Sequence, residues 1–91
     1  MHAVVTRSTI RDLEEARKAL KDEGVPRVSQ APGFVGAHWV SLDGNNGASM
    51  LVFESEETAK AAAEQIRAAG SPAGSAVTVD SVEVGEVVAH A

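Results

Sequence analysis

The sequence predicts a single α+β domain whose elements follow one another as strand, helix, strand, strand, helix and strand. Two short segments carry this prediction. Residues 31–34, Ala-Pro-Gly-Phe, end a helical pattern and begin an apolar one, and residues 53–57, Phe-Glu-Ser-Glu-Glu, end an apolar pattern and begin an alanine-rich helix. Because the chain has 91 residues, we expect one domain over residues 1–91, built around a single core.

The N-terminal segment is typical of a strand that leads into a capped helix. Residues 1–6 are apolar, with β-branched valines in the middle. We expect Ser8 or Thr9 to cap the helix that follows, with Asp12 completing a capping box from Thr9. The first strand is therefore predicted to be short.

A long helix is predicted next, because apolar residues recur at a helical period from residue 10 to residue 28. Pro26 lacks the backbone N–H that a helical hydrogen bond needs, so we expect a kink or a short break near Gly24. Pro32 and Gly33 predict the end of this helix.

The middle of the chain predicts a hairpin. Residues 34–42 and 48–54 form its strands, and the Asp-Gly-Asn-Asn-Gly sequence at residues 43–47 forms its turn. Asn and Gly tolerate the positive φ angles of tight hairpin turns, which makes this signal strong.

The length of the hairpin loop decides which side chains share a face of the sheet. A two-residue Asn-Gly turn is the commonest solution for such a sequence, and we favour it. This turn places His38 on the face of Ser49, Leu51 and Phe53. A loop of three or five residues would place Trp39 there instead.

The second helix is predicted to begin after Ser55 as its cap. Gly70 is expected to end it, and residues 71–75 are expected to form a flexible loop. Its buried stripe is nearly all methyl groups, so the helix is expected to lie close to the sheet: Ala59, Ala62, Ala63, Ile66 and Ala69.

Residues 76–89 predict a long last strand in which the apolar pattern changes parity. Val77 and Val79 point one way, whereas Val82 and Val84 have the opposite parity. Such a change predicts a bulge or a bend. Valines on both faces of the strand would need a partner chain to cover them.

Composition excludes several classes of function. The chain has no cysteine, which removes disulfides, thiolate metal sites and cysteine nucleophiles. Its net charge is −5 and its basic residues are scattered, so we expect no nucleic-acid partner. We find no signal-peptide pattern and no apolar run of membrane-spanning length, and we expect a cytoplasmic protein with no membrane association.

The order of the elements, the Pro-Gly-Phe segment and the Phe-Glu-Ser-Glu-Glu segment together resemble the dimeric α+β barrel superfamily over essentially the whole chain. The superfamily includes antibiotic-biosynthesis monooxygenase-like domains, haem-degrading monooxygenases and muconolactone isomerase-like enzymes. The resemblance implies a ferredoxin-like βαββαβ fold with a four-stranded antiparallel sheet. It also implies a homodimer, in which two sheets face each other as an α+β barrel and the last strand reaches the other subunit.

Within this resemblance, haem degradation is disfavoured. Haem-degrading members have an Asn in the first strand, a Trp at the end of the third and a haem-ligating His on the second helix. The corresponding places here hold Thr6, Phe53 and an alanine. We therefore expect no cofactor. The cofactor-free quinone-forming monooxygenases rely on polar and aromatic residues in the barrel, and this chain has one Trp and no Tyr.

His38 is the candidate catalytic residue, because an imidazole titrates near neutrality and can act as acid or base on a small aromatic ligand. The alternative is a partly buried histidine bonded to a backbone carbonyl or to water. Trp39 could stack on a ligand or belong to the core. Thr6, Trp39, Leu51 and Phe53 are expected to line the same pocket.

Two further histidines, His2 and His90, lie at the ends of neighbouring strands in this fold. Two imidazoles without a third ligand make a poor metal site, so we predict none.

Two functional hypotheses follow. The first is a cofactor-independent monooxygenase-like or isomerase-like enzyme that binds a small hydrophobic or aromatic molecule in the barrel, with His38 polarising or deprotonating it. The alternative is a non-catalytic module that binds a ligand or a partner, or only dimerises. Whether the protein is an enzyme stays open from the sequence.

Overall fold

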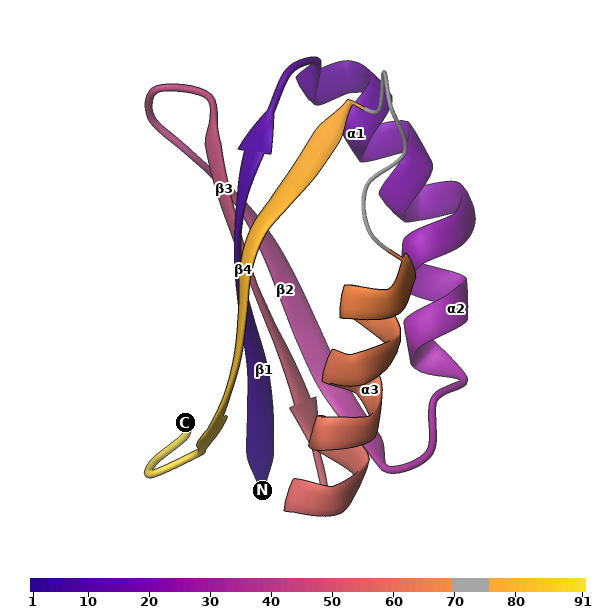
Figure 1. The fold of residues 1–91 in the computed structure, drawn as a ribbon, viewed down its shortest axis with the longest axis vertical. Coiled ribbons are helices and arrows are strands. Elements are labelled where there is room, and N and C mark those ends of the chain that lie inside the picture. Colours follow the sequence, from indigo (N-terminus) through magenta and orange to yellow (C-terminus); the bar gives the residue numbers. More distant parts are fainter. Residues whose placement is uncertain (70–75) are drawn as a thin grey trace.

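The computed structural model describes residues 1–69 and 76–91, which fold into two layers (Figure 1). One layer is a four-stranded antiparallel sheet in the order β2-β3-β1-β4. Its strands are β1 (His2–Ile10), β2 (Phe34–Leu42), β3 (Asn46–Phe53) and β4 (Val77–Glu86). The other layer holds α1 (Leu13–Ala19), the π-helical segment η1 (Leu20–Gly24), α2 (Val25–Ser29) and α3 (Glu56–Ala69). The α+β class and the four-stranded antiparallel sheet are thus confirmed, and the strand order is compatible with a ferredoxin-like fold.

The first strand is longer than the sequence predicted. β1 continues to Ile10 because β4 pairs with it along its whole length and supplies hydrogen-bond partners to the extended backbone. The expected cap at Ser8 or Thr9 is therefore wrong. Asp12 caps the helix instead, and its carboxylate accepts a hydrogen bond from the Glu15 backbone N–H at 3.2 Å.

The segments α1, η1 and α2 follow one another without interruption, and together they are called helical region 13–29 here. The irregularity expected near Gly24 is present as a π-helical turn. The Val25 N–H donates to the carbonyl of Leu20, five residues earlier. Pro26 has no N–H, and its ring needs room near the carbonyl four residues before it; the wider turn provides that room.

The hairpin register differs from the one that the sequence favoured. Leu42 pairs with Asn46, so the loop has three residues, 43–45. Gly44 and Asn45 both have positive φ, at 71° and 62°. Asn46 and Gly47, the Asn-Gly pair of the favoured turn, belong to β3 instead, and the odd number of loop residues reverses the expected parity of the two strands.

The reversed parity corrects the assignment of faces on β2. Trp39 pairs with Ser49 and lies on the helix-covered face of the sheet. His38 pairs with Met50 and lies on the opposite, open face. The expectation that His38 shares a face with Phe53 is wrong.

The predicted bulge in β4 is present at Asp80, where the register with β1 shifts between Arg7 and Ser8. The sequence predicted that the valines of β4 would lie on both faces of the strand, and the structure shows the opposite. The shift brings both pairs of valines to the helix-covered face: Val77, Val79, Val82 and Val84 lie opposite Ile10, Ser8, Thr6 and Val4. These valines therefore give no argument for a partner chain.

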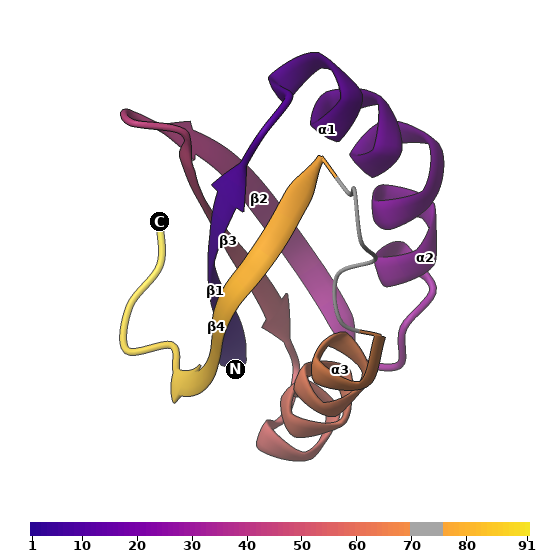
Figure 2. The ribbon, with the colours of Figure 1, turned by 45° about the horizontal axis from the view of Figure 1, so that its top comes forward.

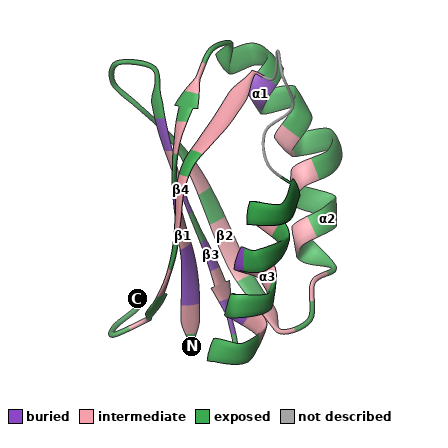
Figure 3. Ribbon diagram, viewed as in Figure 1, coloured by how far each residue is buried: buried purple, intermediate pink, exposed green. Residues whose placement is uncertain are grey.

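The core lies between α3 and the lower part of the sheet in Figure 3, where the buried segments gather. α3 begins after Ser55, whose hydroxyl accepts a hydrogen bond from the Thr58 N–H at 3.2 Å. The predicted end of this helix at Gly70 and the predicted loop at residues 71–75 lie outside the described residues. The buried cluster consists of Val4, Leu51, Phe53, Ala59 and Ala63.

Among the residues described, no helix is both long enough and apolar enough to cross a membrane.

Candidate functional site: a cavity between sheet and helices

A cavity of about 820 Å³ lies between helical region 13–29 and the sheet. In Figure 2, α3 lies against the sheet, whereas helical region 13–29 arches away from it. Small-molecule sites in proteins have volumes of roughly 300–1,000 Å³. The cavity is therefore large enough for a ligand of several rings, and its walls come from both layers of the fold.

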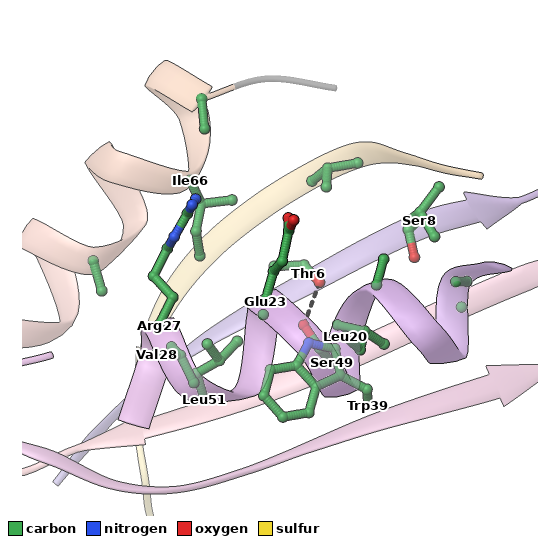
Figure 4. Close-up of a pocket in the computed structure, with 18 of the residues that line it drawn as sticks. Thr6, Ser8, Leu20, Glu23, Arg27, Val28, Trp39, Ser49, Leu51 and Ile66 are labelled. Carbon is green, nitrogen blue, oxygen red and sulfur yellow. Dashed lines mark hydrogen bonds between the residues drawn. The ribbon is translucent and has the colours of Figure 1, made fainter. Parts of the chain in front are cut away.

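The floor of the cavity is one row of side chains across three strands. Thr6 on β1 pairs with Ser49 on β3, and Ser49 pairs with Trp39 on β2. All three line the cavity, together with Leu51 on the next helix-facing position of β3 (Figure 4). The floor thus combines two hydroxyl groups, one indole ring and an aliphatic side chain.

The two hydroxyl groups of the floor bond to each other. Thr6 Oγ1 and Ser49 Oγ form a short hydrogen bond, drawn in Figure 4, and either oxygen can be the donor. Both residues are 7% exposed. The pair is therefore a buried polar group in the floor of the cavity.

The roof of the cavity includes Leu20 and Val28, which project from helical region 13–29 towards the floor in Figure 4. Leu20 begins the π-helical turn, and Gly24, which ends it, also lines the cavity. The π turn thus forms part of the cavity wall, and such turns occur frequently at functional sites. Ile66 of α3 closes one side.

Charged side chains stand at the rim, and all of them are exposed. Arg17 forms an ion pair with Glu14, with 3.1 Å between Arg17 Nη1 and Glu14 Oε1. Glu23 and Arg27 also line the cavity and lie one helical turn apart. Both signs of charge are represented. The rim therefore does not select strongly for an anion or a cation.

The cavity contains some of the residues that the sequence singled out and not others. Thr6, Trp39 and Leu51 line it. Phe53 does not: its ring is fully buried in the core and packs edge to face on Phe34, with ring centroids 5.9 Å apart. His38 is exposed on the open face of the sheet and does not line the cavity.

Ser49 is the functional candidate that sequence reasoning missed. It stands two residues before Leu51 and four before Phe53, so its place on the helix-covered face follows from the alternation of a strand. The alternation of the strand therefore indicated its face. Its role depends on the hydrogen bond to Thr6, and the pairing of β1 with β3 that forms this bond is not evident from the sequence.

Neither terminal histidine belongs to a group of three or more potential metal ligands among the described residues. The described residues contain no cluster of three or more His, Cys, Asp or Glu side chains able to hold a metal ion. His2 Nε2 instead lies 3.6 Å from a carboxylate oxygen of Glu56, at the N-terminus of α3.

The open face of the sheet is unusually apolar on its β2–β3 half. Val40, Leu42 and Met50 are 49%, 43% and 48% exposed there. An antiparallel sheet with one solvated face normally carries polar residues on that face. The β1–β4 half of the same face carries exposed charges, Arg7 and Glu83.

No protein-family model, no curated protein and no solved structure matches this chain.

Proposed function

We propose that this protein binds a small, mostly apolar organic molecule in the cavity beneath helical region 13–29. The cavity of about 820 Å³ is the observation that carries the proposal. Its walls come mainly from aliphatic side chains and one indole, and a few polar groups converge on its floor. This combination is typical of ligand sites.

Binding without catalysis is the function that this geometry supports best. Among the cavity-lining residues that the structure describes, the titratable side chains are Arg17, Glu23 and Arg27, and all three stand exposed at the rim. A general acid or base must lie within hydrogen-bond reach of the atom it serves. The floor offers hydroxyl groups and an indole, which orient a ligand but do not exchange protons with it near neutral pH.

We also propose that the protein is a homodimer in which the open faces of two sheets meet, as in the dimeric α+β barrels that its sequence resembles. Exposed apolar side chains gathered on one face mark interaction surfaces. The supporting observation is the patch formed by Val40, Leu42 and Met50. A second candidate function, a cofactor-independent monooxygenase-like activity, draws its support from this dimer, because His38 would then lie between the two sheets.

A neutral fluorescent probe tests the binding proposal. N-phenyl-1-naphthylamine gains fluorescence in apolar sites, and we expect saturable binding to one site per chain. Ala62 lines the cavity, so Ala62→Phe should fill part of it and weaken binding about ten-fold, or about 1.4 kcal/mol. Ala68→Phe, on the exposed side of the same helix, is the matched control and should bind as the wild type does. Equal binding by both variants would place the probe elsewhere and overturn the proposal.

Sedimentation equilibrium tests the dimer. Met50→Lys puts a charge in the centre of the open face and should produce a monomer. Val25→Lys alters a residue of similar exposure (39%) on the helical layer and should leave the dimer intact. A monomeric wild-type protein at micromolar concentration would contradict the dimer proposal, and the monooxygenase-like activity would lose its support.

A further inference from the structure

The Thr6–Ser49 pair holds one hydroxyl proton that the described part of the chain does not use. Each hydroxyl group has one proton to donate and two lone pairs. One proton forms the bond between Thr6 and Ser49, and the other remains on the accepting hydroxyl. Neither side chain makes another hydrogen bond to a described residue. The floor of the cavity therefore presents one free O–H donor.

The position of this donor makes it selective. Thr6 and Ser49 are each 7% exposed, and the strands around them use their backbone carbonyls in the sheet. A buried donor left without an acceptor destabilises the state that contains it, and a ligand group that replaces water there must accept the same hydrogen bond. A ligand that reaches the floor therefore needs an acceptor atom at that point.

The neighbouring side chain limits the shape of the ligand. Trp39 lies directly opposite Ser49 in the hairpin, so its ring stands beside the hydroxyl pair (Figure 4). Indole rings prefer flat, apolar partners that stack on them or meet them edge to face. The rim charges of both signs, Glu23 and Arg27, give no preference for a charged ligand.

We propose that the ligand is a neutral, planar aromatic molecule with a carbonyl group, and that this carbonyl accepts a hydrogen bond from the Thr6–Ser49 pair while the ring packs on Trp39. This assignment rests on the proposed function of the cavity. The pair acts as one donor: the proton can come from either oxygen, because either can donate to the other.

Two probes of nearly equal shape test the assignment. 2-Acetonaphthone has a carbonyl group, and 2-ethylnaphthalene has a methylene in its place. Their dissociation constants are measured by equilibrium dialysis against the wild type, Thr6→Val, Ser49→Ala and the double variant. The quantity compared between proteins is the ratio of the two dissociation constants. The two probes differ in their free energy of transfer out of water, but this difference is the same for every variant and therefore does not affect changes in the ratio.

We expect the double variant to shift this ratio about ten-fold towards the hydrocarbon, as the loss of one buried hydrogen bond predicts. Each single variant should stay within about two-fold of the wild type, since the remaining hydroxyl keeps its own proton and can still donate it. As a second readout, the infrared carbonyl stretch of bound 2-acetonaphthone should lie at a lower frequency in the wild type than in the double variant.

The other outcomes each overturn a defined part of this assignment. An unchanged ratio in the double variant, with both probes bound, would refute the carbonyl contact and leave the cavity function standing. A full shift in one single variant would refute the shared donor. Failure of both probes to bind to the wild type would refute the proposed function together with the inference. If the double variant did not fold, a wild-type carbonyl stretch at the frequency of an apolar solvent would refute the contact.

Discussion

Helix α3 and helical region 13–29 cover the same face of one sheet in opposite ways. α3 meets the sheet through Ala59 and Ala63, which are fully buried and small enough to bring the helix close to the strands. Helical region 13–29 has one buried residue, Ala16, and holds larger side chains over the cavity. One half of this small domain therefore provides packing, and the other half provides space.

The largest expected effect compares one aromatic residue from each half, Phe53 and Trp39. Phe53 is fully buried beside α3, and Phe53→Ala should lower the free energy of unfolding by about 3–5 kcal/mol. Trp39 is half-buried and faces the cavity, so Trp39→Ala removes fewer contacts and should cost less than about half of that amount. Urea denaturation followed by circular dichroism measures both variants. Equal losses would show that the cavity wall is packed as tightly as the core.

The location of these two aromatic residues also shows how far the sequence predicts this molecule. The order of the elements and the bounds of β2 follow from patterns of apolar residues and from Pro-Gly punctuation, because each is decided within a few residues of the chain. The face that Trp39 occupies depends on the exact length of a turn. A segment containing Gly44, Asn45, Asn46 and Gly47 offers positive-φ residues to several turns, and the tertiary pairing chooses among them.

The bulge at Asp80 gives the same lesson for β4. The parity change between Val79 and Val82 predicts an irregularity, but it does not say whether the valines end on one face or on two. Pairing with β1 decides this, because the helix-covered positions of β1 fix which residues of β4 lie opposite them. The candidate site depends on both registers, β2 with β3 and β4 with β1. Because the sequence does not fix these registers, it did not single out Ser49 as a site residue, and it placed His38 on the wrong face.

Two adjacent alanines on α3 provide a finer test of packing against space. Ala63 is fully buried on the core, so Ala63→Leu should overpack it and lower the free energy of unfolding by about 1–3 kcal/mol. Ala62 is half-buried and lines the cavity, so Ala62→Leu has room for the added carbons and should change stability by less than about 0.5 kcal/mol. Thermal and urea unfolding compare the two variants. A larger loss for Ala62→Leu than for Ala63→Leu would reverse the assignment of the packed and hollow halves.

The last expected effect lies where the two halves touch, at Gly33. This residue connects helical region 13–29 to β2, has a φ of +73°, and would place a Cβ atom 2.8 Å from Thr58 Oγ1 on α3. The left-handed backbone alone costs an L-residue about 1–2 kcal/mol, and we expect Gly33→Ala to lower the free energy of unfolding by about that amount or slightly more.

The matched control for this variant is Gly36→Ala, three residues later on β2, where φ is not positive and an added Cβ would meet nothing within 4 Å. Its stability should stay equal to that of the wild type or rise by up to about 1 kcal/mol, because alanine restricts the unfolded chain more than glycine does. If Gly33→Ala proved as stable as Gly36→Ala, the Thr58 side chain would be able to move away from the added Cβ atom without a cost in stability. The hollow half would then not be anchored to the packed half at this point.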